Sequence, residues 1–242
     1  MCIRDSYQPE VQILGPLVWA EALVRWHHPQ RGLLSPAAFI PLAEETGFVV
    51  ELGRWVLEQA VVQMAQWSGA PRGAAPTSVS VNLSTWQLVD GDIVRLTADL
   101  LDQHDLDPSS LYFELTETAL LREPDVALAA LDALKDLGVG LAIDDFGTGY
   151  SSLSYLRTLP VDAVKIDHSF VQGLGVDRRD DSIVDAIIAM ARSFGIVTVA
   201  EGVETDAQLE RLADLGCDFV QGYLLARPGE ADELEAWMQR RR

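Results

Sequence analysis

The sequence predicts a βα-repeating barrel, an α/β fold within one domain, on three observations. Seven short apolar runs have the length and composition of buried strands, at residues 18–26, 79–84, 111–118, 140–147, 161–167, 197–204 and 218–224. Helix-length amphipathic segments separate most of these runs. The runs also end near side chains that can bind a metal or transfer a proton, as expected at the carboxyl ends of barrel strands.

The size and composition of the chain suit this fold. A chain of 242 residues with 48% hydrophobic residues can build one barrel with a large core. No apolar stretch approaches the roughly 20 residues that cross a bilayer, and residues 1–6 lack the layout of a signal peptide. Cys2 and Cys217 are a weak basis for a disulfide framework, and we expect Cys217 to be a small buried hydrophobe. These features favour a reducing, cytoplasmic location.

The charge of the chain restricts its ligands. A formal net charge of −19 argues against binding a long nucleic acid, whose phosphates must be neutralised by Lys and Arg. A small phosphodiester is not excluded, because metal ions can supply positive charge locally. Of the 18 basic residues only Lys135 and Lys165 are lysines. Lys165 ends a predicted strand, where its ammonium can contact a water molecule or a phosphate.

Capping residues mark the predicted helices. Ser35 precedes Pro36 and predicts a helix start, and residues 51–67 carry apolar side chains at helical spacing. A loop is expected at residues 69–76. Further helices are predicted at residues 124–137, ending at Gly138, at residues 181–194, ending at Gly195, and after a Thr205–Gln208 capping box, ending at Gly216.

The alternation of side chains along the strands collects polar groups on the barrel side. Glu21, Leu23 and Arg25 share one face of the first clear strand. Glu114 and Asn82 lie on the corresponding faces of two later strands. Strands covered by helices have no favourable place for such groups except a hydrated barrel mouth.

Asp144 and Asp145 close a predicted buried strand and suggest a two-metal centre. Neighbouring carboxylates repel each other unless a cation lies between them. An isolated Asp-Asp pair is more often a turn or a helix cap, but carboxylates and an amide at equivalent strand ends favour the metal interpretation. Oxygen donors without a Cys or His cluster suit Mg²⁺ or Mn²⁺ better than zinc. The additional predicted donors are Glu21, Asn82, Glu114 and Glu201.

A glycine-containing loop follows these two acids at residues 146–149. It is too short for a Walker loop and wrongly placed for a dinucleotide fingerprint. We expect a mobile lid that couples substrate binding to metal occupancy, with an ordinary βα turn as the alternative.

Taken in order, these motifs resemble the EAL-domain family, the cyclic-di-GMP-specific phosphodiesterases of bacterial signalling. The resemblance runs from residue 7 to about residue 228, and its motifs lie at residues 21–26, 28–47, 79–84, 114–118, 144–153, 164–167, 200–205 and 216–228. It implies a TIM-like (β/α)8 barrel with an antiparallel first strand. Residues 1–6 do not resemble the opening strand of the family. We therefore expect a non-family start at residues 1–6, either truncated or foreign, and the family domain over residues 7–242.

The resemblance also implies roles for individual residues. Two Mg²⁺ or Mn²⁺ ions would be held by Glu21, Asn82, Glu114, Asp144, Asp145 and Glu201. Lys165 would contact the attacking water, and Glu201 would orient or deprotonate it. The substrate would be contacted by Gln8, Leu23 and Arg25. The catalytic set would be Glu201, Lys165, Asp145, Glu204, which anchors the lid, and Gln221, which supports the ligands.

The function expected from the resemblance is metal-dependent hydrolysis of cyclic di-GMP to linear 5′-pGpG. A homodimer is expected, as is a sensor or cyclase domain upstream in the full-length protein, with no polymeric nucleic acid and no membrane contact by this domain. One alternative is a catalytically silent receptor or interaction module that binds cyclic di-GMP without cutting it. Another is a barrel enzyme that uses metals on a phosphorylated metabolite or an enolisable acid.

Overall fold

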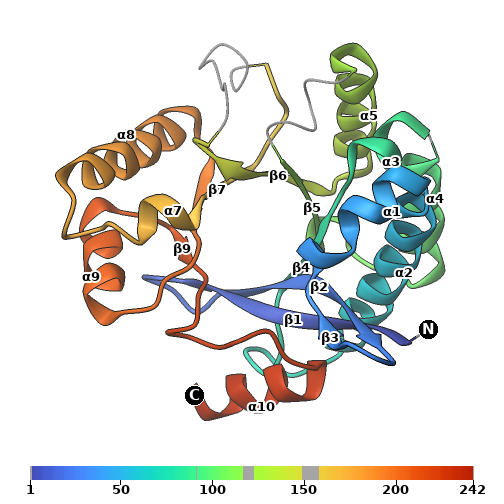
Figure 1. Ribbon diagram of the computed structural model, residues 1–242, viewed down its shortest axis with the longest axis horizontal. Coiled ribbons are helices and arrows are strands. Elements are labelled where there is room, and N and C mark those ends of the chain that lie inside the picture. The colour runs from blue at the N-terminus through green and yellow to red at the C-terminus, as the bar shows by residue number, and fades with distance from the viewer. Residues whose placement is uncertain (1, 91, 117–122, 149–157, 242) are drawn as a thin grey trace.

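The computed structural model describes residues 2–90, 92–116, 123–148 and 158–241. Within these ranges, eight strands close a barrel (Figure 1). They are β1 (Cys2–Gln12), β2 (Val18–His28), β4 (Ser78–Asn82), β5 (Leu111–Thr116), β6 (Gly140–Phe146), β7 (Ala163–Ile166), β8 (Val197–Ala200) and β9 (Phe219–Val220). A short strand, β3 (Gly32–Leu34), extends the edge of β2.

Strand β1 runs opposite to the rest of the barrel. It pairs antiparallel with β2 and β9, whereas β2, β4 and the later neighbours pair parallel as far as β9. The predicted TIM-like (β/α)8 barrel with an antiparallel first strand is therefore confirmed. The β1–β2 pairing begins at Cys2, so residues 2–6 are part of the same strand as Gln8. The proposed domain boundary at residue 7 stays a prediction.

Helices cover the outside of the barrel. In Figure 1, α8 and α9 lie on one side and α2 to α5 on the other, with α10 beside β1. The α-helices are α1 (Ile40–Thr46), α2 (Val49–Ser68), α3 (Thr85–Asp90), α4 (Ile93–Gln103), α5 (Pro124–Leu137), α7 (His168–Val171), α8 (Arg178–Phe194), α9 (Asp206–Leu215) and α10 (Ala231–Arg241). Two 3₁₀ turns, η1 (Pro36–Ala38) and η2 (Pro108–Ser110), precede α1 and β5. In the part of the chain described, none of these helices has the length and apolar character needed to span a bilayer.

Several predicted helix ends are confirmed. Gly138, Gly195 and Gly216 follow α5, α8 and α9 in the left-handed conformation. Thr205 and Gln208 form both hydrogen bonds of the capping box at the start of α9. The loop at residues 69–76 also joins α2 to β4 as expected.

One predicted helix is broken and one predicted helix start is wrong. Ser35 is the N-cap of η1 and Pro36 its first residue, as predicted, but the segment after them is not one helix, because η1 ends at Ala38, its C-cap Phe39 has φ −138° and α1 begins afterwards. Pro41 explains the break, since within a continuous helix its ring would collide with the carbonyl of Ala37. Helix α8 begins at Arg178 rather than at residue 181, because the Asp177 side chain accepts the Arg179 N–H and caps it there.

The main core lies between the strands and the helices, and the inside of the barrel differs between its two ends. Leu57, Val79 and Phe113 are fully buried in this outer core, and Cys217 is buried beside it, as expected. Inside the barrel, at the amino ends of the parallel strands (the lower end), the Trp19 ring stacks on Phe219 with centroids 4.1 Å apart and on Tyr112 at 4.9 Å. We call these three rings the aromatic floor. At the carboxyl ends of the parallel strands, the inward side chains are polar instead, and we call this the polar end of the barrel.

Candidate functional site

Lys165 of β7 lies at the centre of the polar end and is only 1% exposed. Its Nζ is 2.8 Å from Glu114, 2.8 Å from Glu201, 3.1 Å from Glu21 and 3.4 Å from Glu10. One ammonium is therefore surrounded by four carboxylates. Such a cluster carries an excess of negative charge that the protein does not balance locally.

The register of the sheet brings these groups together. Glu21 of β2 lies opposite Ser80 of β4, and Asn82 lies opposite Glu114 of β5. Their inward side chains meet because alternate residues of each strand face the barrel interior. Asn82 donates to Glu21 Oε1 at 2.8 Å, and Gln221 donates to Glu21 Oε2 at 2.8 Å.

The carboxylates form two groups of three, whose oxygens lie within 4.8 Å of one another in each group. The inner triad is buried and consists of Glu10, Glu21 and Glu114. The outer triad is half-buried and consists of Asp144, Asp145 and Glu201. All six residues predicted as metal ligands thus lie at one end of the barrel, five in these triads and Asn82 against Glu21.

Burial dominates the proton affinities of the cluster. It raises the pKa of Glu10 to about 7 and that of Glu201 to about 8, and Lys165 offsets only part of this effect. Burial also acts to raise the pKa of Glu21, but Lys165 and the hydrogen bonds from Gln221 and Asn82 outweigh it, so that pKa is lowered. The pKa of Lys165 is raised well above its usual value because its carboxylates outweigh the effect of burial.

The two aspartates at the end of β6 are close to further acids. Burial raises the pKa of Asp144, and Glu21 adds to the effect. Burial also raises the pKa of Asp145, followed by repulsion from Asp144 and Asp167. Asp145 has φ 53°, a left-handed backbone conformation that Asp tolerates better than most residues, and its N–H donates to Asp144 Oδ1 at 2.9 Å.

This donor set fits divalent cations. Carboxylate and amide oxygens are the ligands that Mg²⁺ and Mn²⁺ prefer. The Gln221 Oε1 and Glu10 Oε1 atoms are buried and have no hydrogen-bond partner among the described residues. In the outer triad, Glu201 has Lys165 as an ion-pair partner, but no ion pair is found for Asp144 or Asp145 within the described chain. Added positive charge would relieve the repulsion within this triad.

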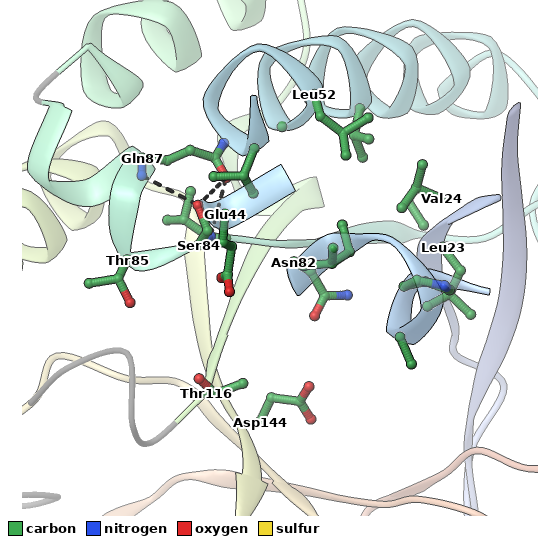
Figure 2. A pocket seen from close by; sticks show the side chains of 18 of the residues that line it. Leu23, Val24, Glu44, Leu52, Asn82, Ser84, Thr85, Gln87, Thr116 and Asp144 are labelled. Carbon is green, nitrogen blue, oxygen red and sulfur yellow. Dashed lines mark hydrogen bonds between the residues drawn. The ribbon is translucent and has the colours of Figure 1, made fainter. Parts of the chain in front are cut away.

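Two cavities meet at this cluster. The larger, of about 530 Å³, extends from Glu21 and Glu201 along α1 and α2. Figure 2 shows Asn82 and Asp144 facing it from β4 and β6, with Leu23 on its far side. The smaller, of about 320 Å³, is lined by Gln8, Glu204 and Gln221 among others. Glu21, Leu23 and Glu201 line both cavities.

The remaining predicted residues lie around the smaller cavity or near it. Gln8 donates to the Ala226 carbonyl at 3.1 Å and accepts from Gln221 at 3.3 Å. Arg25 is half-buried, and its guanidinium donates to the Val24 carbonyl at 3.0 Å. Glu204 lines the cavity, but the motif that contains the predicted lid, residues 144–153, is described only as far as residue 148. The anchoring role of Glu204 therefore stays a prediction.

Two buried acids of the site, Glu10 and Asp167, were not predicted from the sequence. Glu10, 2% exposed, follows Gln8 by two residues on the inward face of β1, so strand alternation could have identified it. Asp167, 5% exposed, follows β7 and accepts the Ser169 backbone N–H at 3.1 Å and the Ser169 hydroxyl. Its other oxygen lies 2.9 Å from His168 Nδ1. Asp167 is the last residue of a predicted run, but its spacing alone did not distinguish it from a helix cap.

Comparisons with known proteins agree with this arrangement. The model of the EAL domain family matches residues 4–228. The chain is 47% identical over 231 residues to the bifunctional diguanylate cyclase/cyclic di-GMP phosphodiesterase MucR of Pseudomonas aeruginosa, covering 95% of this chain and 33% of that protein. It is 40% identical over 235 residues to the cyclic di-GMP phosphodiesterase PA2567 of the same organism, covering 97% of this chain and 40% of that protein.

A solved structure of a cyclic di-GMP phosphodiesterase is also similar to this chain. The PaMucR phosphodiesterase in complex with c-di-GMP superposes with a TM-score of 0.90 and 45% identity, covering 96% of this chain and 94% of that chain. The chain thus spans about a third of the length of MucR and 40% of that of PA2567, while it covers nearly all of the solved domain.

Proposed function

The chain belongs to the EAL domain family, and on that premise we propose that it hydrolyses cyclic di-GMP to linear 5′-pGpG. Its relatives MucR and PA2567 are named as cyclic di-GMP phosphodiesterases, and the similar PaMucR structure is a complex with c-di-GMP. Both relatives are much longer than this chain, so the activity is proposed for the domain that this chain contains and not for a whole protein of their length.

One geometric observation carries the proposal. Two cavities, of about 530 Å³ and 320 Å³, meet at a carboxylate cluster and share Glu21, Leu23 and Glu201. A cyclic dinucleotide has the matching shape, with two nucleosides on either side of its phosphodiester bonds. The scissile phosphate would lie against the shared residues, and Leu23 would contact the sugar-base region between the cavities.

The proposed ligands of two Mg²⁺ or Mn²⁺ ions are Glu21, Asn82, Glu114, Asp144, Asp145 and Glu201. When bound, such ions supply the positive charge that a negatively charged phosphodiester needs in this acidic site and lower the pKa of water. Mg²⁺ and Mn²⁺ both accept the oxygen donors present, and the choice between them is part of the proposal.

The residues of the chain then have distinct roles. Glu201 lies beside Lys165 in the outer triad, where its carboxylate would orient the attacking water and accept its proton once metal ions keep it ionised. Lys165 holds Glu201 through an ion pair of 2.8 Å, and its charge stabilises the negative charge that develops on the phosphoryl oxygens. Gln221 holds Glu21 in place, and Arg25 and Gln8 contact the dinucleotide. Asp145 and Glu204 would link the metal site to the proposed lid, which follows β6.

The test is turnover of cyclic di-GMP by the purified chain with Mg²⁺, with Mn²⁺ and with a chelator, with products separated by chromatography. We expect 5′-pGpG to form only with a metal ion. Binding of cyclic di-GMP without cleavage would replace the enzyme by a receptor. Absence of both binding and cleavage would overturn the assignment of substrate.

We also propose a homodimer in the cytoplasm and, in the full-length protein, a sensor or cyclase domain before this one. The partial coverage of MucR, whose name includes a cyclase activity, supports the additional domain. Sedimentation of the purified chain would test the dimer, and a single species of about 26.5 kDa would contradict it.

A further inference from the structure

Glu10 differs in position from the other carboxylates around Lys165. It comes from the antiparallel strand β1 and is 2% exposed. Its Oε1 lies 3.4 Å from Lys165 Nζ but forms no hydrogen bond with the described residues. Glu10 lines a cavity of only about 10 Å³ together with Ser80 and Trp19, between Lys165 and the aromatic floor. It lines neither of the two larger cavities, so a substrate in them does not reach it.

The charges around Lys165 change when metal ions bind. Three of its four carboxylate partners, at 2.8, 2.8 and 3.1 Å, belong to the proposed ligand set. A cation on these groups occupies their oxygen lone pairs and repels the nearby ammonium. A buried ammonium without a partner is strongly destabilised. Among the described residues, Glu10 is the one carboxylate in contact with Lys165 that lies outside the ligand set.

We propose that Glu10 is the counter-ion that Lys165 keeps when metal ions bind, a positioning residue that holds this ammonium while the other three carboxylates bind the ions. The inference rests on the proposed function, because it requires metal ions at the cluster. Glu10 lines the small cavity beside the aromatic floor, whereas Glu21 and Glu201 line the two larger cavities, so Glu10 would draw the ammonium away from the ions. It acts through Lys165 and touches neither metal nor substrate.

The first experiment compares the unsubstituted chain with Glu10→Gln, which keeps the size of the side chain and removes its charge. Titration calorimetry with Mn²⁺ should show affinity reduced roughly 10- to 100-fold, the usual range for residues that support metal ligands. The kcat for cyclic di-GMP should fall while KM stays the same. Thermal unfolding in chelator should show an equal or higher midpoint, because one of four crowded carboxylates has been removed.

A double-mutant cycle separates action through Lys165 from a direct effect of charge on the ions. In a Lys165→Met background, Glu10→Gln should leave Mn²⁺ affinity unchanged within twofold. An equal loss in both backgrounds would show that Glu10 acts on the ions directly and would overturn the inference. If Lys165→Met does not fold, Glu10→Asp replaces it: the shorter side chain keeps the charge but withdraws from Lys165, so it should also lose affinity, and full affinity would overturn the inference.

Ser80→Ala is the matched control, because it alters the same small cavity without changing a charge. It should leave Mn²⁺ affinity and kcat unchanged. A Glu10→Gln variant that fails to fold, or that melts well below the parent in chelator, would assign Glu10 a packing role and overturn the inference. If the unsubstituted chain neither binds Mn²⁺ nor cleaves cyclic di-GMP, the proposed function falls and this inference with it.

Discussion

The inner and outer triads consist of the same kind of side chain but are stabilised differently. Every member of the inner triad contacts the Lys165 ammonium and is at most 6% exposed. In the outer triad only Glu201 contacts Lys165, and all three members are half-buried. The protein therefore supplies its own cation to one triad and leaves the other with an excess of negative charge.

This difference indicates where charge must come from outside. Within the inner triad, Lys165 and two hydrogen-bond donors keep the pKa of Glu21 lowered, whereas burial raises the pKa of Glu10 and of Glu114 despite their contact with Lys165. Asp144 and Asp145 have no ion-pair partner among the described residues and burial raises their pKa values, so added positive charge would stabilise their ionised forms. The outer triad is thus the part of the site that metal ions should change most.

The largest effect is expected from removing the internal cation. Lys165→Met leaves the inner triad without a counter-charge, so the free energy of unfolding at about pH 8 should fall by about 3–5 kcal/mol. At about pH 5 the loss should be smaller, because the acids then bind protons. Urea unfolding in chelator measures both values.

Lys135→Met is the matched control, since Lys135 is the other lysine of the chain and pairs with Asp162 at 2.8 Å near the surface. It should cost less than about 1 kcal/mol. Equal losses for the two lysines would remove the contrast between a buried and a surface ion pair.

Neutralising one member of the outer triad should affect activity and stability in opposite directions. Asp144→Asn should lower kcat at least roughly 100-fold, because residues that only support ligands already cost 10- to 100-fold. Its melting midpoint in chelator should not fall, since the amide removes a repulsion from the folded state. A clear loss of stability without metal would mean that Asp144 is structural.

The next effect is on pH dependence. The pKa of Glu201 in the folded protein, about 8, exceeds its ordinary value of 4.5, so between these values the folded state holds a proton that the unfolded chain has lost. This contribution to stability is complete below about pH 4.5 and disappears as the pH rises through about 8. Metal ions must displace that proton, so Mn²⁺ affinity should rise by up to roughly tenfold per pH unit over the same interval. Calorimetry at several pH values measures this slope, and a flat profile would contradict the raised pKa.

The smallest effect concerns the backbone of the outer triad. Asp145 has φ 53°, which Asn also tolerates but Ala does not. In chelator, Asp145→Ala should be about 1 kcal/mol less stable than Asp145→Asn, although both remove the same charge. Chemical unfolding of the two variants isolates the strain, and equal stabilities would show that the loop relaxes.

Much of the site could be predicted from local sequence. Glu21, Asn82 and Glu114 are inward positions of strands with clear alternation, and parallel strands bring their carboxyl ends to one edge. Asp144 and Lys165 follow from the same rule. The barrel was therefore predictable from periodicity, while the direction of β1 came only from the resemblance to a family.

The rest depends on contacts between distant strands. Lys165 was expected at a strand end, in contact with water or phosphate, but three strands and the residue after β8 place carboxylates around its ammonium. No spacing within one strand contains that information. Glu10 could not be predicted from the strand ends, because β1 runs in the opposite direction and carries Glu10 deeper into the barrel than Gln8, to the level of Trp19. The break at Phe39 was missed because Pro36 suggested a helix start and hid the effect of Pro41.

The aromatic floor has a consequence for molecular traffic. Trp19 stacked between Tyr112 and Phe219 closes the lower end of the barrel, and above it the space is limited to about 10 Å³, room for roughly one water molecule. Among the described residues there is no room for a larger molecule to pass from the metal site through the aromatic floor, so ligands would enter and leave on the side of the two larger cavities. A substrate and its product must then use the same entrance in turn, and accumulated product will compete with incoming substrate for occupancy.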